Sequence, residues 1–356
     1  MTGDSSQSLV TAFVLSYNHP KKLIECVNSL IAQTCIDEIL ILENFSTEKM
    51  EETYEAIRQL SRLSAPIQIK IEYAPEPLNY SQGQNWGLEK AKNELVLLMN
   101  NDAFFKRPDS LSSSVSLLKK DPKIAIIGHK IFNPDGSLNH CGVFLPFGNN
   151  LFAHFGRYED PQRIEFQVPQ YHIAVTGACL LAKKTEIRFD PVYWFEYEDI
   201  DFCFQYLTRG FKVLCNPFCE VIHEESSSRV SFQNADQVWI KKQKAGVAHF
   251  FKKWKHNWLF FRYKSLTDIL LNSVHDTKRL MGPVANTVAA VVIFCTIIYC
   301  GWFLAFLLLL LLFVLIQGVF NVGAFLFVWK KRTQLRKEYQ NSFYQDISQQ
   351  NGLPES

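Results

Sequence analysis

The chain has 356 residues, of which 47% are hydrophobic, and it carries a formal net charge of only +2 at pH 7. A chain of this length and hydrophobicity can bury a sizeable core in one large domain or two smaller ones. The nearly balanced charge gives no general reason to expect nucleic-acid binding, so we predict no nucleic-acid partner.

The nine cysteines are odd in number and irregularly spaced, which favours reduced thiols over a disulfide framework. Cys215 and Cys219 are four residues apart, but no second pair at zinc-ligand spacing accompanies them. We therefore interpret them as half-buried cysteines rather than as a metal site. The first residues, MTGDSSQSL, lack the basic and apolar regions of a secretory signal. We expect the domain to stay in the compartment where it is made.

Strand-like and helix-like patterns alternate between residues 9 and 127. We expect strands at 9–15, 38–42, 67–71, 95–99 and 124–127, and helices at 20–31, 47–63, 81–92 and 111–119. Pro20 favours a helix start, since proline fits the first helical position. Such alternation predicts an α/β domain whose sheet is parallel and covered by helices on both faces.

Polar residues follow the ends of the first four predicted strands. In open α/β sheets ligands bind beyond the carboxyl ends of the strands. These residues are therefore the candidate ligand-binding set: Ser16, Tyr17, Asn18, Glu43, Asn44, 79–87, Asn100, Asn101 and Asp102.

The pattern between residues 128 and 223 is less regular. A helical face at Ile200, Cys203, Phe204 and Leu207 predicts a helix that ends before Gly210, and residues 211–215 favour a strand. Glu198 and Asp199 would begin that helix, where the helix dipole favours carboxylates.

Residues 241–280 hold ten Lys or Arg against two Asp, with six Phe or Trp residues interleaved. This composition favours an amphipathic helix on an anionic membrane surface over a solvated basic connector. We assign residues 236–280 to this segment and residues 1–235 to the preceding domain.

No residue between Leu280 and Trp329 is charged. One helix of that length would span more than ~70 Å, over twice the ~30 Å hydrocarbon core. We therefore predict a hairpin of two transmembrane helices at 281–329, near 283–301 and 304–328, rather than a buried soluble hairpin. Basic residues flank both outer ends, which places the domain, both termini and the polar tail at 330–356 in the cytoplasm. The bilayer is thus an expected partner, and we expect a multi-pass membrane protein.

Several motifs follow one another in an order typical of one enzyme family. They are Val14–Asn18, Cys26–Leu30 with Gln33–Thr34, Glu43–Ser46, Gly83–Gly87, Asn100–Asp102, Thr176–Cys179 and Glu198–Asp201. Together they resemble family 2 glycosyltransferases with the GT-A fold. The segment Gly128–Ile131, with Asp135, Gly136 and Gly142, is similar to the rhamnosyltransferase-like branch. The resemblance implies a Rossmann-like α/β domain with a mixed central sheet that binds a nucleotide-sugar.

The resemblance also implies roles for the residues that match these motifs. Donor binding is expected from Ser16, Tyr17, Asn18, Glu43, Asn44, Asn79, Asn85 and Asn101, and acceptor binding from Thr176, Gly177 and Trp194. Asp102 matches the metal-binding motif, and His223 stands where many members have a histidine near the diphosphate and metal. The expected cofactor is Mg²⁺ or Mn²⁺, since Mg²⁺ keeps water and phosphate ligands beside one or two carboxylates.

Asp199 matches the catalytic base that takes a proton from the acceptor hydroxyl, and Glu198 is the second candidate. Capping of its helix is the alternative role for Asp199. The expected reaction moves a sugar, with inversion, from a nucleotide-diphosphate-sugar (dTDP-rhamnose or a UDP-sugar) to a hydroxyl of a lipid-linked or envelope glycan. A membrane anchor would raise the enzyme's effective concentration near a glycolipid acceptor.

Three residues depart from the family pattern: Glu43 replaces an aspartate, Asn79 a glycine, and Gln205 a frequent arginine. These departures keep a second interpretation open, a catalytically inactive membrane scaffold with the same fold. A sugar nucleotidyltransferase is a third, although the residues after the first strand, Ser16–Pro20, lack the glycine-rich loop that it needs. The sequence does not specify the oligomeric state.

Overall fold

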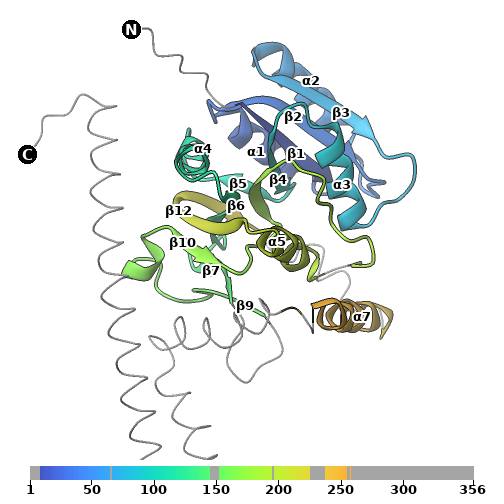
Figure 1. The fold of residues 1–356 in the computed structure, drawn as a ribbon. Coiled ribbons are helices and arrows are strands. Elements are labelled where there is room, and N and C mark those ends of the chain that lie inside the picture. Colours follow the sequence, from blue (N-terminus) through green and yellow to red (C-terminus); the bar gives the residue numbers. More distant parts are fainter. Residues whose placement is uncertain are drawn as a thin grey trace, which may run out of the picture. The chain divides into compact units, whose positions relative to one another are not determined.

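Figure 1 shows the fold in a computed structural model, which describes residues 9–64, 66–144, 152–194, 196–224, 237–254 and 257. The chain divides into two compact units, and all the described residues belong to the first, which comprises residues 1–144 and 152–260. The predicted membrane hairpin and polar tail lie outside the described residues. Among the helices that are described, none is long and apolar enough to cross a membrane.

The N-terminal half forms the predicted parallel α/β layer. Its strands are β1 (Val10–Ser16), β2 (Ile36–Glu43), β3 (Gln68–Tyr73) and β4 (Leu95–Asn100), and its helices are α1 (Pro20–Ile31), α2 (Glu51–Leu63) and α3 (Tyr80–Lys90). The strands pair in the order β3-β2-β1-β4, all parallel. Their carboxyl ends therefore share one edge, where the predicted polar residues meet.

Local side-chain bonds explain where two of these helices begin. The side-chain oxygen of Asn79 accepts a hydrogen bond from the Gln82 N–H, and the side-chain oxygen of Gln82 accepts one from the Asn79 N–H, so a capping box starts α3. We predicted that α2 would start at residue 47, but it starts at Glu51. The Asn18 side chain accepts the N–H groups of Thr47 and Glu48 and holds them in a loop.

The second half makes the sheet mixed. It adds β5 (Ala103–Phe105), α4 (Leu111–Lys120), β6 (Ile124–Phe132), β7 (Leu138–His140), β10 (Gln170–His172), β11 (Cys179–Lys183), α5 (Glu198–Thr208) and β12 (Lys212–His223). Strand β11 runs antiparallel between β4 and β6, and β12 runs parallel to β6. Strands β8 (Val143–Phe144) and β9 (Ala153–His154) pair separately, and a 3-10 turn covers Ile164–Phe166. The predicted strand at 211–215 is thus the first part of a longer one.

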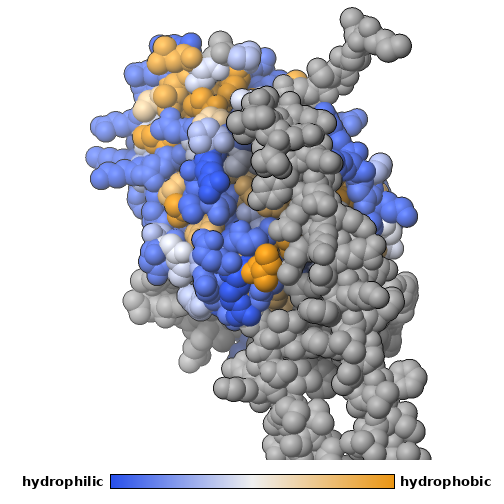
Figure 2. All heavy atoms as spheres, turned by 90° about the vertical axis from the view of Figure 1, so that its left-hand side faces the viewer, coloured by the Kyte–Doolittle hydropathy of each residue, from blue (hydrophilic) through white to orange (hydrophobic). Residues whose placement is uncertain are grey.

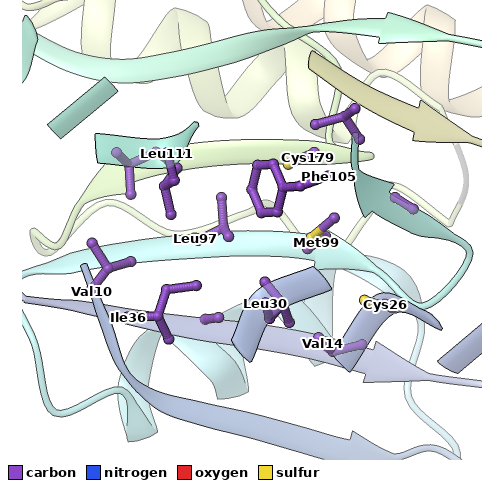
Figure 3. Close-up of a cluster of buried hydrophobic side chains, with 14 of the residues drawn as sticks. Val10, Val14, Cys26, Leu30, Ile36, Leu97, Met99, Phe105, Leu111 and Cys179 are labelled. Carbon is purple, nitrogen blue, oxygen red and sulfur yellow. The ribbon is translucent and has the colours of Figure 1, made fainter. Parts of the chain in front are cut away.

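The core lies where α1 and α4 pack on the sheet. Figure 3 shows Val14 of β1, Leu30 of α1, Met99 of β4 and Phe105 of β5 gathered in it, all buried. The seven cysteines among the described residues are free and buried. Cys215 and Cys219 are therefore core residues, more buried than the half-buried state that we predicted.

The outer surface mixes side-chain types. On the face in Figure 2, hydrophilic side chains alternate with small groups of hydrophobic ones. Such scattered apolar exposure is normal for a folded domain.

Helix α7 (Gln237–Trp254) packs on the domain next to α5 (Figure 1). The ring centroid of Phe204 in α5 lies 5.3 Å from that of Phe250 and 5.7 Å from that of Trp254. Phe251 stacks on Phe152. Phe250, Phe251 and Trp254 of the predicted membrane-surface segment therefore pack on the domain, and the first compact unit extends past residue 235. The membrane-surface prediction then depends on the exposed lysines of α7 and on residues outside the described ranges.

Candidate active site

An acidic and a basic side chain meet at the edge of the sheet. Strand β5 pairs antiparallel with β12, with Ala103 opposite His223, so Asp102 comes to lie beside that histidine. The Oδ1 atom of Asp102 is 3.2 Å from Nε2 of His223, and each side chain is 12% exposed. The Asn100 side-chain nitrogen is 3.4 Å from the same ring nitrogen. The two predicted metal ligands, 121 positions apart in sequence, are thus neighbours.

The charge on Asp102 is stabilised by its surroundings. Burial alone would raise the pKa of this carboxyl, but the hydrogen bond and charge of His223 outweigh it and hold the pKa below its ordinary value. Lys22 and His19 add smaller attractions. The group is therefore an anion at neutral pH, as a metal ligand must be.

Asp102 and His223 suit a Mg²⁺ or Mn²⁺ ion that keeps water and phosphate ligands, rather than a metal held entirely by protein side chains. Within the described ranges, no cluster of three or more His, Cys, Asp or Glu could hold a metal ion. One carboxylate and one imidazole leave several coordination positions, which a hard cation fills with water and phosphate oxygens.

The loop after β1 is held in place by Asn101. Its amide donates to the carbonyl oxygens of Tyr17, at 3.2 Å, and Asn18, at 2.9 Å. Asn18 has a φ of 57°, a left-handed conformation that asparagine tolerates better than most residues. Asn101 therefore shapes the predicted donor loop beside Asp102.

Glu43 ends β2 and organises the next loop. Its carboxylate accepts the Ser46 N–H at 2.6 Å and the Tyr54 hydroxyl, and the Ser16 hydroxyl lies 3.1 Å from that of Tyr54. Burial, with the hydrogen bond to Glu43 as the next cause, raises the pKa of Tyr54, so this tyrosine stays a neutral donor.

Beside Glu43 lies a cavity of about 480 Å³. Its lining comprises Glu43, Phe45, Ser46, Glu48, Met50, Glu51, Tyr54, Arg58, Tyr73 and Ala74. Aromatic side chains beside a carboxylate suit a planar group with N–H donors, such as a nucleobase. Asn44 instead exchanges two hydrogen bonds of 2.9 Å with the Leu78 backbone and fixes the chain that leads to α3.

The N–H and the carbonyl oxygen of Gly177 are each hydrogen-bonded by a side chain. Asp199 Oδ2 accepts the Gly177 N–H at 2.9 Å, and the Tyr80 hydroxyl donates to the Gly177 carbonyl oxygen at 2.8 Å. A Cβ atom at this position would lie 2.7 Å from the Tyr80 oxygen, so only glycine fits without a shift. Its neighbour Thr176 donates its N–H to His140 Nε2 at 3.3 Å. The predicted acceptor residues Thr176 and Gly177 and the predicted base thus come together.

Asp199 does not cap α5. Tyr197 is the N-cap residue, and Asp199 lies within the first turn, where Oδ1 accepts the N–H of Ile200. Burial raises the pKa of Asp199, and the N–H groups of Gly177 and Ile200 oppose that rise only in part. The carboxyl is therefore a better proton acceptor than an ordinary aspartate. The second candidate base, Glu198, precedes it and is half-buried.

Tyr80 is the site residue that the sequence motifs did not single out. Burial raises its pKa well above the ordinary value, and the charges of Glu198, Asp199 and Asp102 raise it further. The tyrosine therefore lies within electrostatic reach of both the predicted base and the predicted metal ligand. Its position directly after the capping residue Asn79, at the rim of the sheet, is the sequence feature that could have identified Tyr80 as a site residue.

Two predicted donor-binding residues hold a neighbouring loop in this structure. Both amide atoms of Asn85 bond the Phe189 backbone at 2.8 Å, and the Asn79 amide donates to Pro191 at 3.0 Å. Asn79 has a φ of −74°, so no left-handed conformation requires the family's glycine here. Trp194, at the end of that loop, is 48% exposed. Donor contacts of Asn79 and Asn85 stay predictions.

Comparison with known proteins places this geometry in context. Residues 11–172 match Glycosyl transferase family 2. The uncharacterized protein y4gI of Sinorhizobium fredii (strain NBRC 101917 / NGR234) is 29% identical over 235 residues, which cover 62% of this chain and 25% of y4gI. The O-antigen biosynthesis protein RfbC of Myxococcus xanthus is 28% identical over 230 residues, which cover 62% of this chain and 18% of RfbC. The match thus covers at most a quarter of these relatives' length.

A solved structure shares the fold. It is the mannosyltransferase PcManGT from Pyrobaculum calidifontis in complex with GDP-Man and Mn²⁺, with a TM-score of 0.51, 14% identity, and coverage of 91% of this chain and 86% of that one. The predicted α/β fold with a mixed, GT-A-like sheet is therefore confirmed. A rhamnosyltransferase-like branch stays a prediction.

Proposed function

We propose that this chain, whose residues 11–172 match Glycosyl transferase family 2, transfers a sugar from a nucleotide-diphosphate-sugar to a hydroxyl group of a glycan or glycolipid. The observation that carries the proposal is a pair of carboxylates, Asp102 and Asp199, whose charges both act on Tyr80. Asp102 lies beside His223, Asp199 lies against Gly177, and the charges of both carboxylates act on the tyrosine. One carboxylate suits the donor side of a transfer and the other suits the acceptor side.

Asp102 and His223 would hold Mg²⁺ or Mn²⁺ on the donor side. When bound, the cation would neutralise the charge that develops on the departing nucleoside diphosphate. The depressed pKa of Asp102 supports this role, because the carboxylate needs no proton release to coordinate.

Asp199 would act as the base. It takes the proton of an acceptor hydroxyl while that oxygen bonds to the anomeric carbon and the bond from this carbon to the diphosphate oxygen breaks. Attack opposite the leaving group inverts the anomeric configuration. The raised pKa of Asp199 supports the assignment, because a base works best when its pKa approaches the operating pH.

The cavity beside Glu43 would take the nucleobase. Uracil and thymine each present one ring N–H to a carboxylate, which fits a UDP-sugar or dTDP-rhamnose. We further propose that residues 281–329 anchor the enzyme by two spans, with the domain and both termini in the cytoplasm, and that the acceptor is lipid-linked. An anchor-deleted form that glycosylates a soluble acceptor equally well would contradict this acceptor.

The test is turnover of a panel of nucleotide-sugars by detergent-purified protein, with Mn²⁺, with Mg²⁺ and with a chelator. We expect metal-dependent release of one nucleoside diphosphate, lost in Asp102→Ala. Glu72→Ala, which removes an exposed carboxylate on β3, is the matched control and should behave as wild type.

The outcomes separate the alternatives. Release of a nucleoside diphosphate only with an acceptor supports transfer. Pyrophosphate formation from a sugar phosphate and a nucleoside triphosphate would instead identify a nucleotidyltransferase. Absence of both turnover and nucleotide binding would favour the inactive scaffold.

A further inference from the structure

The loop of residues 189–194, between β11 and α5, is bound on one side by α3. Asn85 pairs with the Phe189 backbone, the Asn79 amide donates to the Pro191 carbonyl, and the Ser81 hydroxyl lies 3.4 Å from the Tyr193 carbonyl oxygen. The loop ends in the half-exposed Trp194, so these bonds place an aromatic ring near the start of α5. We call residues 189–194 the acceptor loop.

Helix α7 binds the acceptor loop from another side. Asp190 accepts His249 Nε2 at 3.0 Å and Lys253 Nζ at 2.9 Å. The Lys242 ammonium lies 3.3 Å from the ring centroid of Trp194, a cation–π contact. Both ends of the loop therefore have partners on α7.

The same helix binds α5 through Asp201, which has no exposed surface. The Asp201 carboxylate accepts Trp254 Nε1 at 2.7 Å and Lys253 Nζ at 2.8 Å. It also accepts the hydroxyl of Tyr193 at 3.2 Å and the amide of Gln205 at 3.0 Å. Asp201 therefore joins the catalytic helix, the acceptor loop and α7 at one buried anion.

Lys253 forms ion pairs with both carboxylates, Asp190 and Asp201. Burial would lower its pKa, but Asp201 and then Asp190 raise it above the ordinary value. Removing this ammonium would leave Asp201 as a buried charge without its cation, which is strongly destabilising to the local arrangement. Asp201 lies two residues after Asp199 on the same helical turn, so a shift of this turn moves the proposed base.

We propose that α7 is a positioning element of the acceptor site, in which Lys253 and Trp254 fix α5 through Asp201 while Lys253, His249 and Lys242 fix the acceptor loop. The inference rests on the proposed function, because it gives α7 the task of aiming Asp199 and Trp194 at an acceptor sugar. A misplacement of about 1 Å at a distance from the reacting atoms can cost ~10²-fold in rate. Within the part of the chain that the structure describes, Asp102 and Glu43 form no hydrogen bond with α7, so we expect donor binding to be unaffected.

The test compares Lys253→Met with Lys252→Met in the full chain. Lys252 is the adjacent, exposed lysine, so its variant removes the same charge from the outer face of α7. We expect Lys253→Met to lower kcat for transfer to the acceptor by ~10- to ~100-fold, with the affinity for the nucleotide unchanged. Lys252→Met should match wild type, and Lys253→Arg, which keeps the charge, should recover part of the loss.

Hydrogen exchange supplies a readout that does not require activity. The Gly177 N–H bonds Asp199 and the Val192 N–H bonds Asp190 at 3.1 Å, so both amides should exchange faster in Lys253→Met and not in Lys252→Met. If Lys253→Met fails to fold, Trp254→Phe removes only the indole N–H and tests the same bond to Asp201.

Each outcome decides the proposal. Unchanged transfer and unchanged exchange in Lys253→Met would overturn it, and so would an equal loss of nucleotide binding and transfer, which indicates general damage. If wild type turns over no nucleotide-sugar, the proposed function fails, and faster exchange confined to Gly177 and Val192 would still support the positioning role of α7.

Discussion

The carboxylate of Asp199 accepts hydrogen bonds from two backbone N–H groups, those of Gly177 and Ile200. Asp199 lies in the first turn of α5, and it is half-buried. Burial raises its pKa, while two backbone N–H groups keep the anion accessible. This carboxyl therefore binds a proton more readily than an exposed aspartate does.

The pH dependence of transfer should reveal this carboxyl. Asp199 must be deprotonated to act as a base, so kcat/KM should fall as the pH falls through its folded pKa, which lies above the ordinary aspartate value. The acid limb should therefore appear at a higher pH than for an exposed aspartate. Asp199→Asn should lower transfer ~10²- to ~10⁴-fold and remove that limb.

Donor binding provides the control for this prediction. Nucleotide affinity, measured by calorimetry, should be the same in Asp199→Asn and wild type. An acid limb that persists in a still-active Asp199→Asn variant would show that another group, with Glu198 first in line, is the base.

At the scale of elements, the site depends on how closely α3 and α5 approach the turn before β11. Tyr80 from α3 and Asp199 from α5 contact opposite sides of Gly177. A Cβ atom added at Gly87 of α3 would lie 2.3 Å from the Phe13 side chain of β1, and one added at Gly83 would lie 2.6 Å from that of Leu15. These glycines let α3 lie near the sheet, which brings Tyr80 to the turn.

Gly177→Ala should disturb this contact. The added Cβ would lie 2.7 Å from the Tyr80 oxygen, so we expect a destabilisation of about 1–3 kcal/mol together with a loss of transfer. Thermal unfolding and kcat measure the two effects. Combining Gly177→Ala with Tyr80→Phe removes the clashing oxygen and should recover part of the stability, and no recovery would place the strain elsewhere.

At the scale of the whole molecule, the second half of the sheet carries a set of buried histidines. Burial lowers the pKa of His129 from 6.5 to about 4 and that of His140 well below 6.5, and His154 and His172 lower the latter further. Both rings are therefore neutral in the folded protein. In the unfolded chain they would take up protons below their ordinary pKa.

This difference predicts a loss of stability in mild acid. The contribution is fully present above pH 6.5 and is lost as the pH falls towards 4, because the unfolded state then binds more protons. For His129 alone the loss at pH 4 is on the order of 3 kcal/mol. Urea unfolding between pH 7.5 and 4.5 measures it. His129→Gln should flatten the dependence, and an unchanged slope would contradict the prediction.

The sequence by itself determined the order of the elements and the chemistry of the rim. The apolar periodicities of residues 9–127 predicted five strands and the four helices between them, because a buried strand and an amphipathic helix each impose a local repeat. Asp102, Asp199 and His223 were also named from their motifs. The structure brings Asp102 beside His223, and it brings Asp199 to Gly177.

Only the tertiary structure decided which of these residues touch and what else holds them. The bonds of Tyr80 to Gly177, of Asn85 to Phe189 and of Asp201 to Lys253 join segments 97, 104 and 52 positions apart. No local repeat encodes such contacts, because they arise when antiparallel β11 enters the parallel sheet and α7 packs on α5. For the same physical reason, the sequence did not show that Phe250 and Trp254 of α7 are buried against Phe204 of α5.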